Sequence, residues 1–237
     1  FKIPLATSRL NFRDHRKIMT IDGHRSFTGG INIADEYRGQ GVNGRYWEDL
    51  LIEINGPATL GFDNVFLEDW ALSTNELYSL DCNLPRASLD DPGIDRDDSF
   101  LQVIPSGPTF DIANAIVIQF VAAISTSRER CWIATPYFIP DEPLALMLRT
   151  AALRGVDVRI LVPSTQNNDS RLVAFAARSY YDDLLECGCR IYEYTKGMLH
   201  AKYMVIDDYL CAVGTANMDI RSLHINYEVT AMIYDTK

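Results

Sequence analysis

The sequence lacks the paired cysteine motifs of structural zinc sites. Its 237 residues include five cysteines, and no two of them form a CxxC pair. Zinc sites usually combine such pairs with further Cys or His residues at fixed spacing. Cys187 and Cys189 stand close together, but no second Cys or His pair lies at ligand spacing. We expect thiols that mostly pack as free side chains in a reducing compartment.

Basic residues are in the minority. The chain carries 22 Lys and Arg against 32 Asp and Glu, which gives a net charge of −10. Sequence-independent binding of nucleic acid rests on Lys and Arg that neutralise phosphates. A locally basic site can still exist on an acidic protein. The balance of charge therefore disfavours nucleic acid as a partner.

Long apolar runs are missing as well. The longest, residues 112 to 124, is interrupted by Asn114 and Gln119 and is shorter than the roughly 20 residues that a membrane span requires. No signal peptide opens the chain, which begins with Phe1 instead of Met. We expect no transmembrane helix in this chain and a natural N-terminus upstream of it.

One pattern of five residues occurs twice at identical spacing. The offsets from its histidine are 2, 7, 14 and 17 residues in both copies. The matched residues are His15, Lys17, Asp22, Gly29 and Asn32 in the first copy and His200, Lys202, Asp207, Gly214 and Asn217 in the second. Five matches at fixed offsets are hard to obtain by chance, so the pattern predicts two related halves.

Each copy has the signals of a hairpin. An apolar strand, Ile18–Ile21 or Tyr203–Ile206, is followed by an Asp-containing turn and a second strand that reaches the glycine. Successive side chains of a strand point to opposite faces, so the His and Lys of His-x-Lys share one face. They are placed to contact one phosphate together.

Strands and helices alternate before the second copy. We expect strands over 131–135, 156–162 and 190–194, a helix from Glu142 that ends at Gly155, and a helix over about 170–187 that ends at Gly188. This alternation predicts a mainly parallel or mixed sheet covered by helices. Only 14 residues precede His15. We therefore expect the first half to lack its opening βαβ region.

The repeat also predicts the domain boundaries. The first half covers residues 1–82 and the second half residues 100–237. Between them, residues 83–99 read NLPRASLDDPGIDRDDS and form an acidic linker or surface loop. The aspartates of this segment lack the spacing and the glycine of an EF-hand loop, so calcium binding is the weaker interpretation.

Two His-x-Lys pairs provide what phosphodiester exchange requires. One histidine attacks phosphorus, and the other protonates the leaving alcohol and then deprotonates the incoming alcohol or water. Lys17 and Lys202 neutralise the phosphoryl oxygens, and the amides of Asn32 and Asn217 donate hydrogen bonds to them.

A nucleophilic histidine needs a partner that fixes its tautomer. Asp49, before the strand Leu50–Ile54, and Glu228, on the strand Tyr227–Tyr234, are the candidates. We expect the turn residues Asp22 and Asp207 to be structural. The same holds for His24 and His224, which lie outside the repeat. The glycines of the repeat, with Gly30, allow close backbone approach.

The segments HRKIMTID…GGIN and HAKYMVID…GTAN resemble the two HxKx4D signatures of the phospholipase D superfamily. The resemblance implies an α/β fold, a phospholipase D-like pseudo-twofold duplicated sandwich with mixed sheets flanked by helices and, in this chain, an N-terminally truncated first half. It also implies a phosphohistidine intermediate and no metal or other cofactor. By position, Glu228 matches the acid that supports the second histidine, and Asp49 the acid that supports the first. Superfamily members differ in which histidine is the nucleophile, and we favour His15.

Further stretches, among them TGGINIADEY, TPYFIPDEPL and GMLHAKYMVIDD, are similar to bacterial cardiolipin synthases. This resemblance implies that two phosphatidylglycerols are condensed to cardiolipin and glycerol at a bacterial cell membrane, with the catalytic part on the cytoplasmic side. Attachment to that membrane would involve segments absent from this chain. Alternatives are a hydrolytic phospholipase D, a nuclease of the superfamily, and a non-catalytic homologue that binds lipid or phosphate. Both intact His-Lys pairs argue against the non-catalytic homologue.

Overall fold

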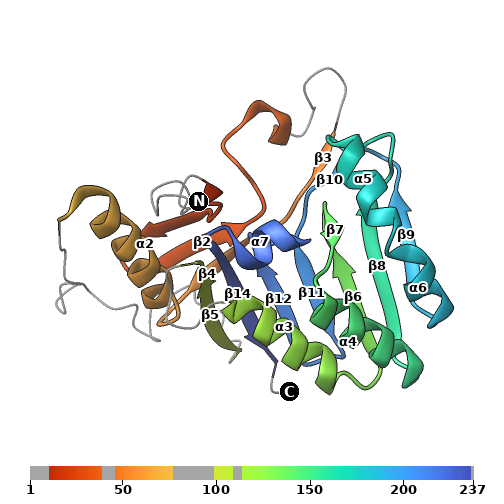
Figure 1. The fold of residues 1–237 in the computed structure, drawn as a ribbon. Coiled ribbons are helices and arrows are strands. Elements are labelled where there is room, and N and C mark those ends of the chain that lie inside the picture. Colours follow the sequence, from red (N-terminus) through yellow and green to blue (C-terminus); the bar gives the residue numbers. More distant parts are fainter. Residues whose placement is uncertain (1–10, 39–45, 77–98, 109–113, 236–237) are drawn as a thin grey trace, which may run out of the picture.

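The computed structural model describes residues 11–38, 46–76, 99–108 and 114–235 (Figure 1). Its largest element is a mixed sheet of seven strands in the order β5-β14-β12-β11-β6-β8-β9. In that order the strands are β5 (Phe100–Ser106), β14 (Glu228–Tyr234), β12 (Leu210–Gly214), β11 (Tyr203–Ile206), β6 (Arg130–Ala134), β8 (Asp157–Pro163) and β9 (Arg190–Tyr194). β6, β8 and β9 run parallel, whereas the other neighbours are antiparallel. The expected mixed sheet is confirmed.

Helices cover this sheet. They are α3 (Ala115–Thr126), α4 (Glu142–Leu153), α5 (Arg171–Arg178), α6 (Tyr181–Glu186) and α7 (Ile220–His224). α3 and α4 lie across one face of it in Figure 1, and their buried side chains, among them Ile124 and Leu148, join those of β6 and β8 in the main core. α4 begins where Asp141 accepts a hydrogen bond from the backbone N–H of Leu144 at 3.1 Å. Gly155, in the left-handed region at φ +92°, follows this helix as predicted.

The prediction of a single helix over about 170–187 is wrong. Two helices, α5 and α6, replace it, and they are separated at Ser179 and Tyr180. The Ser179 hydroxyl donates to the carbonyl of Ala176 at 2.7 Å, and the amides of Ser179 and Tyr180 bond three residues back. A serine side chain that competes for a backbone carbonyl in this way favours a tight turn over continued α-helix.

A smaller sheet belongs to the first half. It has the order β1-β2-β4, with β1 (Ile18–Ile21), β2 (Arg25–Gly29) and β4 (Leu51–Asn55), and the helix α2 (Thr59–Thr74) packs on it. Both predicted hairpins are present: β1 pairs antiparallel with β2, and β11 with β12. Asp22 and Asp207 occupy the two turns with φ of 52° and 50°. The order β1-β2-β4 therefore repeats β11-β12-β14.

Short parallel bridges and one small core connect the halves. β3 (Trp47–Glu48) pairs with β10 (Met198–Leu199), and Asp14 bridges Tyr227. β7 (Phe138–Ile139) pairs with β13 (Met218–Asp219) within the second half, and the 3-10 helix η2 (Asp35–Tyr37) follows β2. The small core is built from Ile54, Phe62, Val229 and Ala231, which come from β4, α2 and β14.

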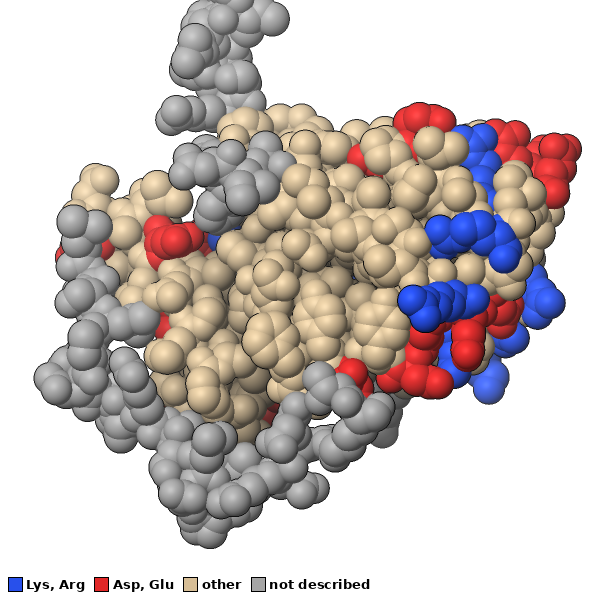
Figure 2. Space-filling model, turned by 90° about the horizontal axis from the view of Figure 1, so that it is seen from below, with Lys and Arg blue, Asp and Glu red and all other residues tan. Residues whose placement is uncertain are grey.

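Other expectations concern the surface and the cysteines. The segment 83–98 of the expected acidic linker lies outside the described residues. The four cysteines that the structure describes are free thiols. No helix among the described residues is long and apolar enough to span a membrane. Seen from below (Figure 2), Lys and Arg gather toward one end of the molecule. Many Asp and Glu side chains lie at the same end, so charged side chains of both signs are concentrated there on this face.

Candidate active site

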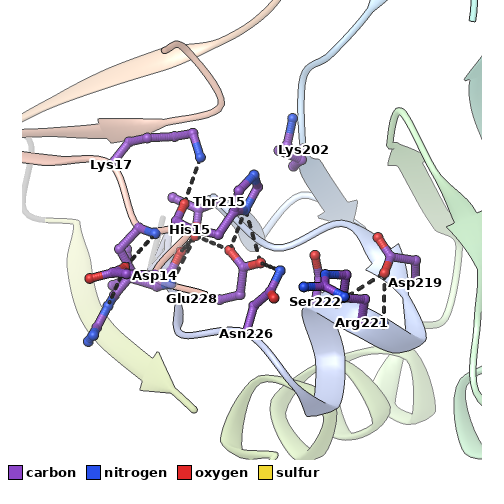
Figure 3. Close-up of polar contacts among 12 residues, drawn as sticks. Asp14, His15, Lys17, Lys202, Thr215, Asp219, Arg221, Ser222, Asn226 and Glu228 are labelled. Carbon is purple, nitrogen blue, oxygen red and sulfur yellow. Dashed lines mark hydrogen bonds and ion pairs between the residues drawn. The ribbon is translucent and has the colours of Figure 1, made fainter. Parts of the chain in front are cut away.

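Backbone hydrogen bonds between the halves place His15 beside Glu228 (Figure 3). The backbone N–H of His15 donates to the carbonyl of Tyr227 at 3.0 Å. Glu228 follows Tyr227, and both of its carboxylate oxygens lie 3.0 Å from Nδ1 of His15. Glu228 is fully buried and also accepts from the Thr215 hydroxyl at 2.5 Å and the Asn226 amide at 3.4 Å. The carboxylate is held from three sides, so it fixes His15 with Nδ1 as donor and leaves Nε2 available.

The second histidine is held in the same manner. The backbone N–H of His200 donates to the carbonyl of Glu48 at 2.6 Å, in continuation of the β3–β10 pairing. Asp49 follows Glu48, and its Oδ2 lies 2.8 Å from Nδ1 of His200. In both pairs, the amide of a histidine thus bonds the carbonyl of the residue before the acid. The same backbone hydrogen bond therefore positions both histidine–carboxylate pairs.

This geometry corrects the predicted pairing of acids and histidines. The resemblance implies that Glu228 supports His200 and that Asp49 supports His15. The structure has the reverse, because the parallel bridges run between the halves and bring each acid to the histidine of the other half. Both predicted carboxylates do contact an imidazole, but each one crosses from one half to the other.

The two lysines lie close to the histidines, Lys202 buried and Lys17 half-buried. Nζ of Lys17 donates to the carbonyl of His15 at 2.6 Å, and Nζ of Lys202 donates to that of His200 and lies 2.9 Å from its Nδ1. Burial lowers the pKa of both lysines, that of Lys202 to about 7, although Asp49 and Glu228 act in the opposite direction. A buried cation is stabilised by an anion that enters beside it, and a phosphate meets this requirement.

His200 is more enclosed than His15. The side chain of His15 is 28% exposed and that of His200 is 7% exposed. Tyr37 and Trp47 pack their rings against His200 with centroids 5.7 Å and 5.2 Å away. Burial lowers the pKa of His200, while its hydrogen bond to Asp49 opposes this shift. At neutral pH this imidazole is therefore held mainly in its neutral form.

The two asparagines of the repeat also lie on different sides. The Asn32 amide donates to the hydroxyl of Tyr37 at 2.9 Å, and this hydroxyl lies 2.9 Å from Nδ1 of His200. Asn217 is buried and lines a pocket of ≈ 580 Å³ together with His15. Asn32 thus connects to His200 through Tyr37, and Asn217 shares a pocket with His15.

The pocket lies beside His15 and not beside His200 because two residues at the same offset in the repeat differ in size. Tyr37 and Ser222 both stand 22 residues after their repeat histidine. Tyr37 fills the space beside His200, whereas the smaller Ser222 lines the pocket beside His15. The apolar side chains of Ile139, Val173 and Ile220 form part of its wall. The two sides of the site therefore differ in size.

Sequence reasoning missed Tyr37, Trp47, Thr215 and Asn226. Tyr37 differs in type from its counterpart, so a search for identical residues in the two copies passes over it. Thr215 stands directly after the repeated Gly214, which was the available signal. Trp47 and Asn226 lie two residues before an acid, Asp49 or Glu228, but the sequence does not show that they approach a histidine.

The remaining predicted residues lie around the site. The carboxylate of Asp207 accepts hydrogen bonds from the backbone N–H groups of residues 128, 129 and 130 at 2.8–2.9 Å, a structural contact. His224 bonds Asp141 at 2.8 Å. A Cβ on Gly29 or Gly214 would overlap a carbonyl of the adjacent strand, which confirms that these glycines allow close approach. A Cβ on Gly30 would overlap the carboxylate of Asp49. Within the described ranges, no group of three or more acidic, His or Cys side chains could hold a metal.

Known proteins are similar to this chain in sequence and in fold. The family described as "Cardiolipin synthase, PLD-like domain" matches residues 120–237. A cardiolipin synthase of Halalkalibacterium halodurans is 41% identical over 240 residues, which cover 100% of this chain and 46% of that protein. A cardiolipin synthase of Geobacillus kaustophilus is 42% identical over 237 residues, which cover 99% of this chain and 45% of that protein.

The chain belongs to the phospholipase D superfamily. It spans about half the length of these curated relatives. The crystal structure of phosphatidylserine synthase from Haemophilus influenzae matches it with a TM-score of 0.69 at 19% identity, over 97% of this chain and 60% of that one. This similarity confirms the expected superfamily fold.

Proposed function

We propose that the protein is a phosphatidyltransferase that condenses two phosphatidylglycerols into cardiolipin and glycerol through a phosphohistidine. The observation that carries the proposal is the pair of crossed histidine–carboxylate contacts beside Lys17 and Lys202. Similarity to proteins named cardiolipin synthases supports the choice of substrate. The reaction is carried by His15, Lys17, Asn32, Asp49, His200, Lys202, Asn217 and Glu228. The supporting residues are Asp22 and Asp207.

In the first step, Nε2 of His15 attacks the phosphorus of one phosphatidylglycerol. The bond from phosphorus to the glycerol oxygen breaks, and His200 gives that oxygen a proton from its imidazolium form, which Asp49 and the negative charge of the bound phosphate favour. His15 is proposed as the nucleophile because it is the more exposed histidine and lines the pocket. Glu228 stabilises the cation that forms on its ring.

In the second step, His200 takes the proton from the terminal hydroxyl of a second phosphatidylglycerol. The alkoxide oxygen attacks phosphorus, the bond to Nε2 breaks, and His15 is regenerated. Lys17 and Lys202, with the amides of Asn32 and Asn217, stabilise the negative charge on the non-bridging oxygens in both steps. Protons and electron pairs balance over the cycle, and no cofactor takes part.

The proposal extends to the wider context of the reaction, and the names of the relatives support its choice of phospholipid substrates. The substrates are phospholipids, and the protein acts at a bacterial membrane, with the catalytic part on the cytoplasmic side. Residues 1–82 and 100–237 form the two halves of the catalytic unit around the acidic segment 83–99. The matching β1-β2-β4 and β11-β12-β14 hairpins support this division.

Lipid product analysis of the full-length protein tests the proposal. Phosphatidylglycerol is the sole substrate, and wild type is compared with His15→Ala and His200→Ala. Cardiolipin with an equal amount of glycerol, lost by about 10³-fold or more in both variants, is expected because each histidine is needed for a chemical step. Phosphatidic acid as the main product would establish a hydrolase in place of a transferase. Wild-type protein that binds lipid without any turnover would establish a binding protein.

A further inference from the structure

Exposed apolar side chains surround the opening of the His15 pocket. Leu172 and Phe175 on α5 are 83% and 60% exposed, and Ile220 at the start of α7 is 46% exposed. Val173 and Ile220 line the pocket itself. Side chains of this size are unfavourable in water, and several together usually mark a surface that binds something.

α5 has the pattern of a helix that lies on an interface. Ala174 and Ala177 are buried against the protein, while Arg171, Leu172, Phe175 and Arg178 face outward. Large apolar side chains flanked by arginines on one face suit the boundary between acyl chains and anionic headgroups. Arg178 bonds Glu193 at 2.9 Å, and Arg171 makes no ion pair within the part of the chain that the structure describes.

The position of α5 connects this surface to the chemistry. Ser170, its N-cap, and Val173 line the pocket that contains His15. In Figure 1, α5 stands at the same end of the molecule as β3 and β10, the strands that lead to Asp49 and His200. The pocket that contains His15 thus has apolar residues of α5 and α7 in its lining.

We propose that the outward face of α5, with Ile220, rests on the surface of a phospholipid bilayer. The diacylglycerol part of the donor lipid then extends from the His15 pocket over Val173 and Ile220 into the bilayer. The side of His200, which Tyr37 and Trp47 close, receives only the small headgroup. Charge complementarity between Arg171 and anionic phospholipid supports a lipid occupant, whereas two copies of this chain, each with a net charge of −10, repel each other. The proposal rests on the proposed function for its substrate.

Kinetics on two physical forms of the same lipid test this surface. Leu172→Ser/Phe175→Ser in the full-length protein should lower turnover of phosphatidylglycerol vesicles by about tenfold or more, because two apolar side chains lose their burial in lipid. Turnover of monomeric dihexanoyl-phosphatidylglycerol should stay within about twofold of wild type. Leu153→Ser is the matched control, since Leu153 is 72% exposed on α4. Equal loss on both substrates, or no loss on vesicles, would overturn the proposal.

An environment-sensitive fluorophore gives a readout that does not depend on turnover. It is attached to Phe175→Cys or, as control, Leu153→Cys, and spectra are compared in proteoliposomes and in a lipid-free amphipol. A blue shift at position 175 that requires lipid is expected. A shift already present without lipid would assign the surface to another protein segment or a second copy, and no shift at all would also overturn the proposal. Protein that shows the lipid-dependent shift but no turnover would refute the proposed function alone.

Discussion

Each imidazole of the site contacts, through Nδ1, a carboxylate from the other half. Glu228 is fully buried and Asp49 nearly so, so each acid depends on its histidine and a few donors for stabilisation. A carboxylate in this position holds one tautomer and stabilises the imidazolium that forms during reaction. Replacement by the neutral amide keeps the size and removes the charge.

Glu228→Gln should lower kcat by roughly 10²–10⁴, as the loss of a histidine-orienting acid does in other enzymes. The same change should shift the side-chain ¹H–¹⁵N signals of His15 in NMR spectra and leave those of His200 in place. Asp49→Asn should do the opposite. The sequence has only four histidines, so single His→Gln variants can assign every signal. A shift of the His200 signals in Glu228→Gln would contradict the crossed pairing.

The pKa of Lys202 predicts a pH dependence of activity. Burial lowers this pKa to about 7, and only the charged ammonium neutralises a phosphoryl oxygen. We expect kcat/KM to fall by about tenfold per pH unit above pH 7, as for loss of one essential proton. A profile that stays level from pH 7 to 9 would show that the free protein keeps Lys202 charged there.

The stability of the protein should also depend on the protonation of Lys202, but it should rise with pH where activity falls. The folded pKa of Lys202 lies below its ordinary value of 10.5, so the unfolded chain binds more protons between pH 7 and 10.5. Burial of the charged ammonium therefore lowers the free energy of unfolding by its full amount below pH 7. This loss becomes smaller as pH rises from 7 to 10.5. Lys202→Met should unfold at a higher temperature than wild type at pH 6, and this difference should shrink by pH 9.

At the scale of the elements, the two hairpins are alike in turn geometry but differ in what their aspartates hold. Three backbone N–H groups before and at the start of β6 bond Asp207. Burial opposes ionisation of this carboxyl, but the three donors outweigh it and lower its pKa. The carboxylate of Asp22 has no hydrogen-bond partner among the described residues.

Asp207→Ala should therefore lower the free energy of unfolding by about 1–2 kcal/mol at pH 7, the range for a lost carboxylate–amide cap. Because the folded pKa is depressed, this stabilisation is present above the unfolded value of 3.8 and is lost as pH falls through the folded pKa. Thermal unfolding at pH 7 and at pH 3 measures the change. Asp22→Ala is the matched control, and an equal effect of both changes would contradict a role specific to β6.

At the scale of the whole molecule, activity depends on two short backbone bridges between the halves. One of them, β3–β10, lies next to Asp49 and His200. Gly197 stands just before β10, where a Cβ would overlap the carbonyl oxygen of Tyr46. A methyl group there must push β3 away from β10 and move Asp49 relative to His200.

Gly197→Ala should thus lower kcat by about 10²-fold, the scale of a 1 Å misplacement, while circular dichroism stays close to wild type. Gly188→Ala is the control because a Cβ there meets open space, although φ is +96°. We expect that control to lose about 1 kcal/mol of stability and to keep its activity. If both variants retained full activity, the bridge would not position the site.

Residue patterns by themselves determined much of this protein. The duplicated His-x-Lys with its Asp, Gly and Asn predicted two hairpins and the residues of one shared site. Alternating apolar strands and amphipathic helices predicted the mixed sheet. These features are local, because a period of two or of 3.6 residues is written into consecutive positions. The break at Ser179 was missed because a side-chain hydrogen bond overrode the periodicity.

Only the tertiary structure decided which acid meets which histidine. Asp49 and Glu228 stand 34 and 28 residues after the histidine of their own copy. Nothing in that spacing shows that each acid contacts the histidine of the other half. The parallel bridges at Tyr227 and Glu48 decide it, and their register is a long-range property of how the halves pack. The unequal sides of the site likewise became visible only in the structure, where Tyr37 packs against His200 and the smaller Ser222 lines the pocket that contains His15.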